Sequence, residues 1–181
     1  MKYFAVFSAI IICLGFAACT VPHSQPTPPV ATTSISQLQE VTEVDLNQNI
    51  VMGQTIYVPV YSYIYYDTQD RSFNLATTVS IRNTDLQSPI IINSVRYYNT
   101  EGKLIQEYLS KPGQLTALAS TAVVIDRRDT QGGLGANFII EWQAYQPVSE
   151  PIIEAVMIGT DSGQGISFVS PGRVIQQYEG K

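Results

Sequence analysis

The side chains that most often do covalent or metal chemistry are scarce in this sequence of 181 residues. There is one histidine, His23, and there are two cysteines, Cys13 and Cys19, all near the start. Ser-His-Asp and Cys-His arrangements are therefore excluded for the rest of the chain. Zinc and copper sites lose their usual ligands for the same reason. A Ser-Lys pair would need Lys103 or Lys111, and neither lies in a recognisable motif.

Carboxylates are the remaining candidates for catalysis. Two facing acids can hydrolyse a glycosidic bond, one as the general acid and the other as the base or nucleophile. The acids that could supply such a pair are Asp126, Asp129, Glu141 and Glu154. Acidic side chains are more often simply solvated. We therefore expect no enzyme activity, no cofactor and no metal site, with a carboxylate-dependent hydrolase of polysaccharide as the alternative.

Two polar loops late in the chain could bring charged side chains together. Residues 127–135 lead into a strand that contains Trp142, and residues 160–165 follow the next strand. If these strands run antiparallel, as their short connection indicates, both loops lie at one end. The predicted ligand or partner site therefore comprises Asp126, Arg127, Arg128, Asp129, Asn137, Asp161 and Ser162. Acids and carbonyls could bind calcium, but the two arginines favour ordinary Asp-Arg pairing.

Tyrosines form a second candidate surface. The run 55–66 alternates, with apolar residues on one face and Tyr57, Tyr61, Tyr63 and Tyr65 on the other. These rings could stack on sugars or form a protein contact. They could equally be half-buried residues on the second face of a strand. Pro59 interrupts the run, which indicates an edge position or a bulge.

The glycines at 132, 133 and 135 do not form a phosphate-binding loop. Such a loop ends in Lys-Ser/Thr and is followed by a helix, whereas here an alternating strand follows. We expect a connection that is either mobile or tightly turned.

The N-terminus is typical of an exported, lipid-anchored protein. Met1-Lys2 precedes an apolar run that is too short to cross a bilayer, which indicates a signal peptide over residues 1–18. Leu14-Gly15-Phe16-Ala17-Ala18-Cys19 resembles the bacterial lipobox, with Phe16 where leucine is usual. The resemblance implies that Cys19 carries diacylglycerol. Plain secretion is the alternative. We expect a bacterial cell-envelope protein whose domain faces the periplasm or the exterior.

Residues 19–49 are predicted to be a tether. Their proline-, serine- and threonine-rich composition cannot bury enough surface to order itself. The whole chain has a net charge of −5 and no basic patch, so we expect no nucleic-acid partner. The membrane is then reached through the lipid alone.

The remaining chain is predicted to be one all-β domain over residues 50–175, followed by a tail at 176–181. Strand-like segments are separated by turns, and no stretch has a sustained helical period. This pattern favours a single antiparallel β-sandwich, immunoglobulin-like, with about eight strands. Phe138, Ile140 and Trp142 share one face of a strand, so Trp142 is predicted to be in the core.

Four motifs resemble those of one bacterial family. They are Gly53-Gln54-Thr55-Ile56-Tyr57-Val58-Pro59-Val60-Tyr61-Ser62, Ser80-Ile81-Arg82-Asn83-Thr84-Asp85, Gly132-Gly133 with Gly135-Ala136-Asn137-Phe138, and Glu150-Pro151-Ile152-Ile153-Glu154-Ala155-Val156-Met157-Ile158-Gly159. Together they are similar to an uncharacterised family, domain of unknown function 3124. The resemblance covers residues 50–175 and implies a cell-envelope protein. It implies no activity, cofactor or catalytic residue.

These observations lead to one hypothesis about function. We expect a non-catalytic, lipid-anchored envelope protein that binds an envelope protein or glycan through its loops or its tyrosines. The alternative is a hydrolase of envelope polysaccharide. Two facing acids in a groove would favour the hydrolase, and a flat or convex aromatic patch would favour the binding protein.

Overall fold

The structure of the chain, a computed structural model, describes residues 39–40, 49–161 and 163–180. The predicted signal peptide, Cys19, most of the predicted tether and Ser162 lie outside the described residues. The chain divides into two compact units, residues 1–31 and 32–181, and every described residue belongs to the second. Among the described residues there is no helix that could cross a membrane. Their strands pair antiparallel throughout, so the predicted all-β antiparallel class is confirmed.

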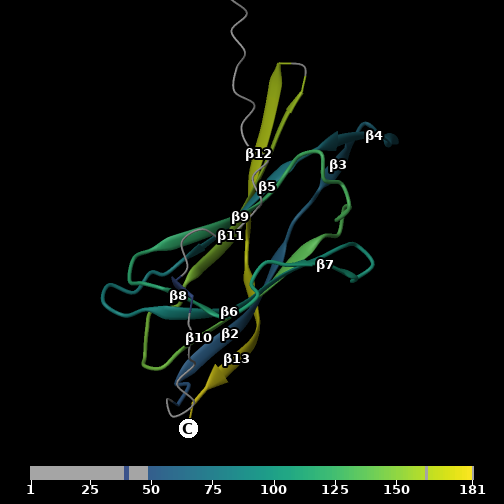
Figure 1. Cartoon of the computed structure of the whole chain (residues 1–181). Helices are drawn as coiled ribbons and strands as arrows, with labels where there is room; N and C mark the ends of the chain where they lie inside the picture. The colour runs from purple at the N-terminus through teal and green to yellow at the C-terminus, as the bar shows by residue number, and fades with distance from the viewer. Residues whose placement is uncertain (1–38, 41–48, 162, 181) are drawn as a thin grey trace, which may run out of the picture. The chain divides into compact units, whose positions relative to one another are not determined.

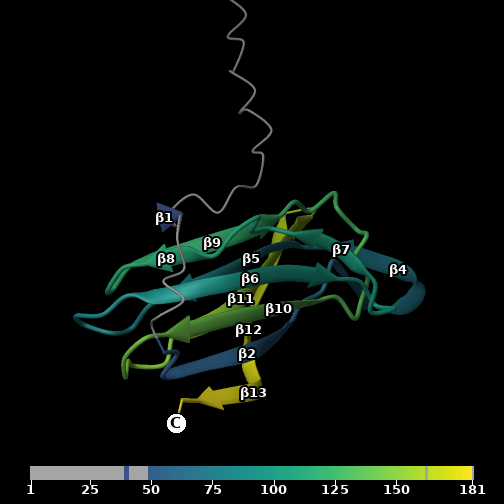
Figure 2. The same ribbon diagram turned by 60° about the horizontal axis from the view of Figure 1, so that its bottom comes forward.

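The larger sheet carries most of the surface discussed below. Its strands are β1 (Gln39–Glu40), β2 (Met52–Pro59), β6 (Ile90–Tyr98), β7 (Leu104–Glu107), β8 (Gly113–Leu115), β10 (Asn137–Ala144) and β13 (Arg173–Glu179). They lie in the order β1-β8-β6-β10-β2-β13, with β7 also beside β6. Figure 2 shows β6, β10, β2 and β13 side by side. β10 therefore lies inside the sheet, between β6 and β2.

The second sheet has four strands, and a separate hairpin precedes it. The four are β5 (Ala76–Arg82), β9 (Ser120–Ile125), β11 (Ile152–Asp161) and β12 (Gln164–Pro171), in the order β12-β11-β5-β9. The hairpin, which we call the aromatic hairpin, consists of β3 (Tyr63–Tyr66) and β4 (Thr68–Asn74). Figure 1 shows it extending from the start of β5.

Both sheets contribute to one hydrophobic core, as expected for a sandwich. In β10 the residues alternate between half-buried and buried, and Phe138, Ile140 and Trp142 are buried. Val79 and Ile81 of β5 belong to the same cluster from the other sheet. Trp142 is 1% exposed, so its predicted core position is confirmed. Alternation places Glu141 and Gln143 on the outer face of the larger sheet.

The chain passes between the sheets at Gly172. β12 ends in the smaller sheet and β13 begins in the larger one, with this single residue between them. The Gly172 N–H donates to the Ile153 carbonyl at 2.8 Å. A Cβ at this position would lie 2.6 Å from that oxygen and 2.6 Å from Cγ2 of Ile56. The crossing therefore requires glycine.

The structure corrects two predicted boundaries. The run 55–66 was expected to be one strand, but it is divided: β2 ends at Pro59 and β3 begins at Tyr63. Residues 176–181 were expected to be a tail, but Gln176 to Glu179 belong to β13 and pair with β2. There are consequently more strands than the eight or so expected. The finer immunoglobulin-like comparison stays a prediction.

Candidate functional site

The two predicted loops meet at one end of the domain. Nη1 of Arg127 donates to the carbonyl of Thr160 at 2.8 Å, which joins the loop after β9 to the end of strand β11. Asp161 belongs to β11 by its backbone, whereas Ser162 is outside the described residues. Asn137 begins β10, where it lies opposite Pro59 and Tyr98 rather than beside Thr160. Of the predicted site, the structure therefore brings Arg127 to the end of β11, and it places Asn137 elsewhere.

Asp126 and Arg128 form an ion pair on this loop. Nε of Arg128 lies 2.9 Å from Oδ1 of Asp126, and the Arg128 backbone N–H donates to the same oxygen at 2.8 Å. These contacts lower the pKa of Asp126 to about 2, the hydrogen bonds from Arg128 being the main cause. Asp129 accepts the N–H of Gln131 at 3.0 Å. Among the described residues, no group of acids, histidines or cysteines is arranged to hold a metal ion.

The glycine-rich segment is a tightly turned connection. Thr100 donates its backbone N–H to the Gly132 carbonyl at 2.9 Å, and Gly135 N–H donates to Thr100 Oγ1 at 3.0 Å. Gly133 has φ 76°, a conformation that favours glycine. A Cβ on Gly132 would overlap the hydroxyls of Tyr97 and Ser62. The sequence predicted a connection that is either mobile or tightly turned, and the structure shows a tightly turned one.

The aromatic hairpin is attached directly to this loop. The Ser62 N–H donates to the Gly133 carbonyl at 3.0 Å, and Ser62 Oγ lies 3.1 Å from the buried Tyr97 hydroxyl. Burial raises the pKa of Tyr97. The base of the hairpin is thus fixed to the glycine loop, and the hairpin and the Arg127 loop share one end of the domain.

The four predicted tyrosines do not form one stripe. Tyr57 lies in β2, whereas Tyr63 and Tyr65 lie in β3 with ring centroids 5.8 Å apart. Tyr61 lies between these strands and meets Phe168 edge-to-face at 6.1 Å. Tyr66, which was not predicted, has the Arg71 guanidinium 5.0 Å from its ring centre. We call Tyr61, Tyr65 and Tyr66 the aromatic end; they are exposed by 37%, 43% and 47%.

At the opposite end, Trp142 and polar residues of the quoted motifs form a hydrogen-bond network, which runs from the core to the surface and was not predicted from the sequence. Trp142 Nε1 donates to Gln54 Oε1 at 3.3 Å, and Gln54 Nε2 donates to Glu150 Oε1 at 2.7 Å. Thr84 Oγ1 donates to the Glu150 carbonyl at 2.7 Å. The presence of Gln54, Thr84 and Glu150 in the quoted motifs was the one sequence feature that could have indicated this network. In the structure these three residues hold strands and loops together.

Asn83 and Asp85 extend this structural role. Asn83 is 2% exposed, and its Nδ2 donates to the carbonyls of Ser88, Leu115 and Thr116. Asp85 accepts the backbone N–H groups of Gln87, Ser88 and Ser149 at 2.8–2.9 Å. These hydrogen bonds lower the pKa of Asp85, and the bond from the Gln87 N–H has the largest effect. The turn after β5 is thereby bonded to two other loops.

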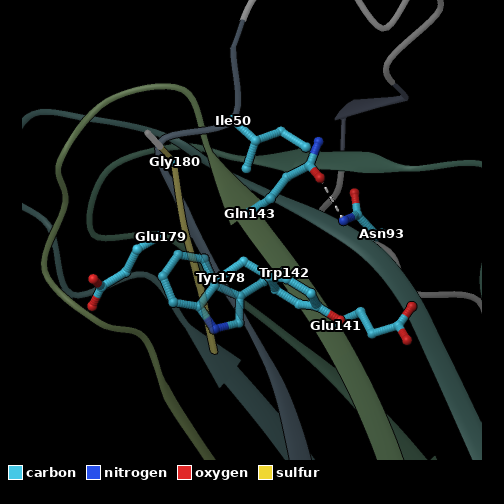
Figure 3. Close-up of a pocket in the computed structure, with 8 residues that line it drawn as sticks. All are labelled: Ile50, Asn93, Glu141, Trp142, Gln143, Tyr178, Glu179 and Gly180. Carbon is cyan, nitrogen blue, oxygen red and sulfur yellow. Dashed lines mark hydrogen bonds between the residues drawn. The ribbon is translucent and has the colours of Figure 1, made fainter. Parts of the chain in front are cut away.

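The outer face of the larger sheet has a hollow of about 340 Å³ (Figure 3). It is lined by Ile50, Asn93, Glu141, Trp142, Gln143, Tyr178, Glu179 and Gly180. Asn93 Nδ2 donates to Gln143 Oε1 at 2.9 Å, the bond drawn in Figure 3. Glu141 accepts Ser94 Oγ at 2.8 Å and Arg96 Nη2 at 2.6 Å. The sequence reasoning considered Glu141 as an acid but did not predict this hollow.

The fold and these contacts define an all-β domain whose shared motifs fix its loops. Residues 53–175 match the family Protein of unknown function (DUF3124), so the chain belongs to this family and the predicted resemblance is confirmed. No curated protein matches the chain. A solved structure similar to the chain is the crystal structure of Thermotoga maritima 1070, with 10% identity and a TM-score of 0.41. The similarity covers 71% of this chain and 97% of that one.

Proposed function

We propose that this protein is a non-catalytic binding protein, held on a bacterial envelope membrane by a lipid on Cys19, that contacts an envelope protein or glycan through its aromatic end. The anchoring rests on the lipobox-like sequence Leu14 to Cys19. The single observation that carries the binding role is the exposure of Tyr61, Tyr65 and Tyr66 at the end of the domain. Tyrosine supplies rigid, amphipathic contact area and is enriched in interfaces.

The attachment of the aromatic hairpin supports a binding role further. Binding residues tend to lie in connections that a rigid scaffold positions. The hairpin is bonded at its base through Ser62 and Gly133, so its tyrosines project from an ordered support. Arg71 also holds the Tyr66 ring by a cation–π contact at 5.0 Å. Such preorganisation reduces the conformational entropy that is lost on binding.

The alternative, a carboxylate-dependent hydrolase, has less support. Three of its candidate acids are close to arginines: Asp126 to Arg128 at 2.9 Å, Glu141 to Arg96 at 2.6 Å and Glu154 to Arg82 at 3.8 Å. A general acid needs a pKa near the working pH, and that of Asp126 is lowered to about 2. The arrangement favours structural ion pairing over proton transfer.

Site-specific photo-crosslinking in living cells tests the binding role. A photoreactive phenylalanine analogue replaces Tyr65, and the matched control places it at Leu86, an exposed apolar residue in the turn that follows β5 at the other end. We expect a discrete adduct from position 65 and none of the same mass from position 86. An absence of adduct at position 65, or the same adduct from both positions, would contradict the proposed role of the aromatic end.

A further inference from the structure

The hollow on the outer face of the larger sheet is shaped by two irregularities in strand pairing. Between β10 and β6 the register steps from Glu141↔Ser94 to Trp142↔Ile92, so Asn93 is the extra residue of a bulge. Between β13 and β2 it steps at Ile175. Bulges redirect side chains and are common beside functional sites. Asn93 itself lines the hollow, whereas the bulge at Ile175 lies in β13 before Tyr178, which lines it.

A missing side chain keeps the hollow open. Gly53 of β2 is the register partner of both Gln143 on one side and Tyr178 on the other. A Cβ at Gly53 would lie 2.6 Å from the Trp142 carbonyl oxygen and 3.3 Å from Cβ of Gln143. A row of side chains across the sheet therefore has a gap at this point. The resulting volume, about 340 Å³, is within the range typical of small-molecule sites.

The polar groups in the hollow form a donor–acceptor couple. Asn93 and Gln143 share one hydrogen bond, Nδ2 to Oε1. This bond orients the two amides and leaves Asn93 Oδ1 as an acceptor and Gln143 Nε2 as a donor. No other hydrogen bond to these two atoms is found among the residues that the structure describes. Adjacent acceptor and donor groups match two neighbouring hydroxyls of a sugar.

Tyr178 adds an aromatic surface that is fixed in place. Its hydroxyl donates to Gln176 Oε1 at 3.0 Å and lies 3.5 Å from Thr55 Oγ1. The residue remains 51% exposed, so part of the ring is accessible. Ile50 supplies further apolar lining, whereas the Trp142 indole is buried in the core. A ring beside oriented amides suits the C–H face and the hydroxyls of a pyranose together.

The charges in the hollow exclude anionic ligands. Glu141 is neutralised in part by Arg96, whereas Glu179 is exposed and accepts Gln177 Nε2 at 3.2 Å. No arginine or lysine lines the hollow among the described residues. Uronates and sugar phosphates would therefore be repelled. We propose that this hollow, bounded by Asn93, Gln143 and Tyr178, is a binding site for neutral saccharides, separate from the aromatic end.

Calorimetric titration of the full chain in detergent tests this site. The probes are the neutral trisaccharides maltotriose, cellotriose and tri-N-acetylchitotriose, with trigalacturonic acid as the anionic probe. We expect at least one neutral probe to bind with a Kd of about 1 mM or tighter, and the anionic probe to bind more weakly. No binding by any neutral probe, or equally tight binding of trigalacturonic acid, would overturn the proposal.

Variants locate the binding and separate it from the aromatic end. Tyr178→Ala and Gln143→Leu should each weaken binding by about tenfold, because the stacking surface or the donor is lost. Tyr178→Phe, which keeps the ring, should bind nearly as the wild type does. Leu86→Ala, in the exposed turn after β5, should leave saccharide affinity unchanged. Tyr178→Ala should leave the crosslinked adduct from position 65 in place, which separates this site from the aromatic end. The proposal fails if Tyr178→Ala binds saccharide normally, or if Leu86→Ala weakens binding as much.

Discussion

The indole Nε1 of Trp142 donates a hydrogen bond to Gln54 Oε1 at 3.3 Å, and both residues are almost completely buried. Gln54 in turn donates to Glu150 at 2.7 Å. One buried amide thus connects the central strand β10, its neighbour β2 and the loop before β11. A buried polar group that loses its partner is costly, so this relationship predicts how stability responds to substitution.

Trp142→Ala should lower the free energy of unfolding by about 3–5 kcal/mol, because it removes the largest buried side chain of the core. Gln54→Ala should cost about 1–3 kcal/mol, because the indole N–H is left unpaired. Chemical denaturation followed by circular dichroism measures both. In the wild type, tryptophan emission should be blue-shifted and should move to the red on unfolding. Native emission already typical of exposed tryptophan would contradict the core position.

Gly132→Ala should destabilise the domain by about 1–3 kcal/mol, because a methyl group there overlaps the Tyr97 and Ser62 hydroxyls. Gly165→Ala is the matched control. Its added Cβ would have its nearest contact at 3.8 Å, so the change should stay within about 0.5 kcal/mol. Thermal unfolding compares the two. Equal effects of both substitutions would show that the glycine loop is not packed as described.

Asp85→Asn should show a pH-dependent loss of stability. The native pKa of Asp85 is lowered by the N–H groups of Gln87, Ser149 and Ser88, so the ionised carboxylate is favoured by folding. Its contribution is complete above the unfolded pKa of about 3.9 and is lost as the pH falls through the lower native value. The Tm difference between wild type and variant should therefore be largest near pH 7 and shrink below about pH 4. A difference that stays constant down to pH 2 would argue against this linkage.

Local pattern was sufficient to predict the class of fold and the strand of Trp142. Phe138, Ile140 and Trp142 alternate with residues that are less buried, and one buried face requires that register. The proximity of the loops after β9 and β11 also followed from chain direction, as the contact between Arg127 and Thr160 shows. These features depend on residues near one another in sequence or on simple topology.

Features that depend on distant pairing could not be predicted in this way. Asn93 enters the outer hollow only because β6 bulges opposite β10, and the break in alternation after Ile92 gave no indication of its partner. Gln176 to Glu179 resembled a tail because β13 has no buried residue, yet it pairs with β2, far away in sequence. The tyrosine run was divided because the chain leaves the larger sheet after Pro59. Tertiary context decides each of these outcomes.

Membrane fractionation of cells that express Cys19→Ser, together with metabolic lipid labelling, tests most directly the central claim that the protein is lipid-anchored. Cys13→Ser is the matched control, because it changes the other cysteine of the chain and lies within the predicted signal peptide. Wild type and Cys13→Ser should both sediment with membranes and carry the label, and Cys19→Ser should be soluble and unlabelled. A Cys19→Ser protein that sediments and labels like the wild type would contradict the claim.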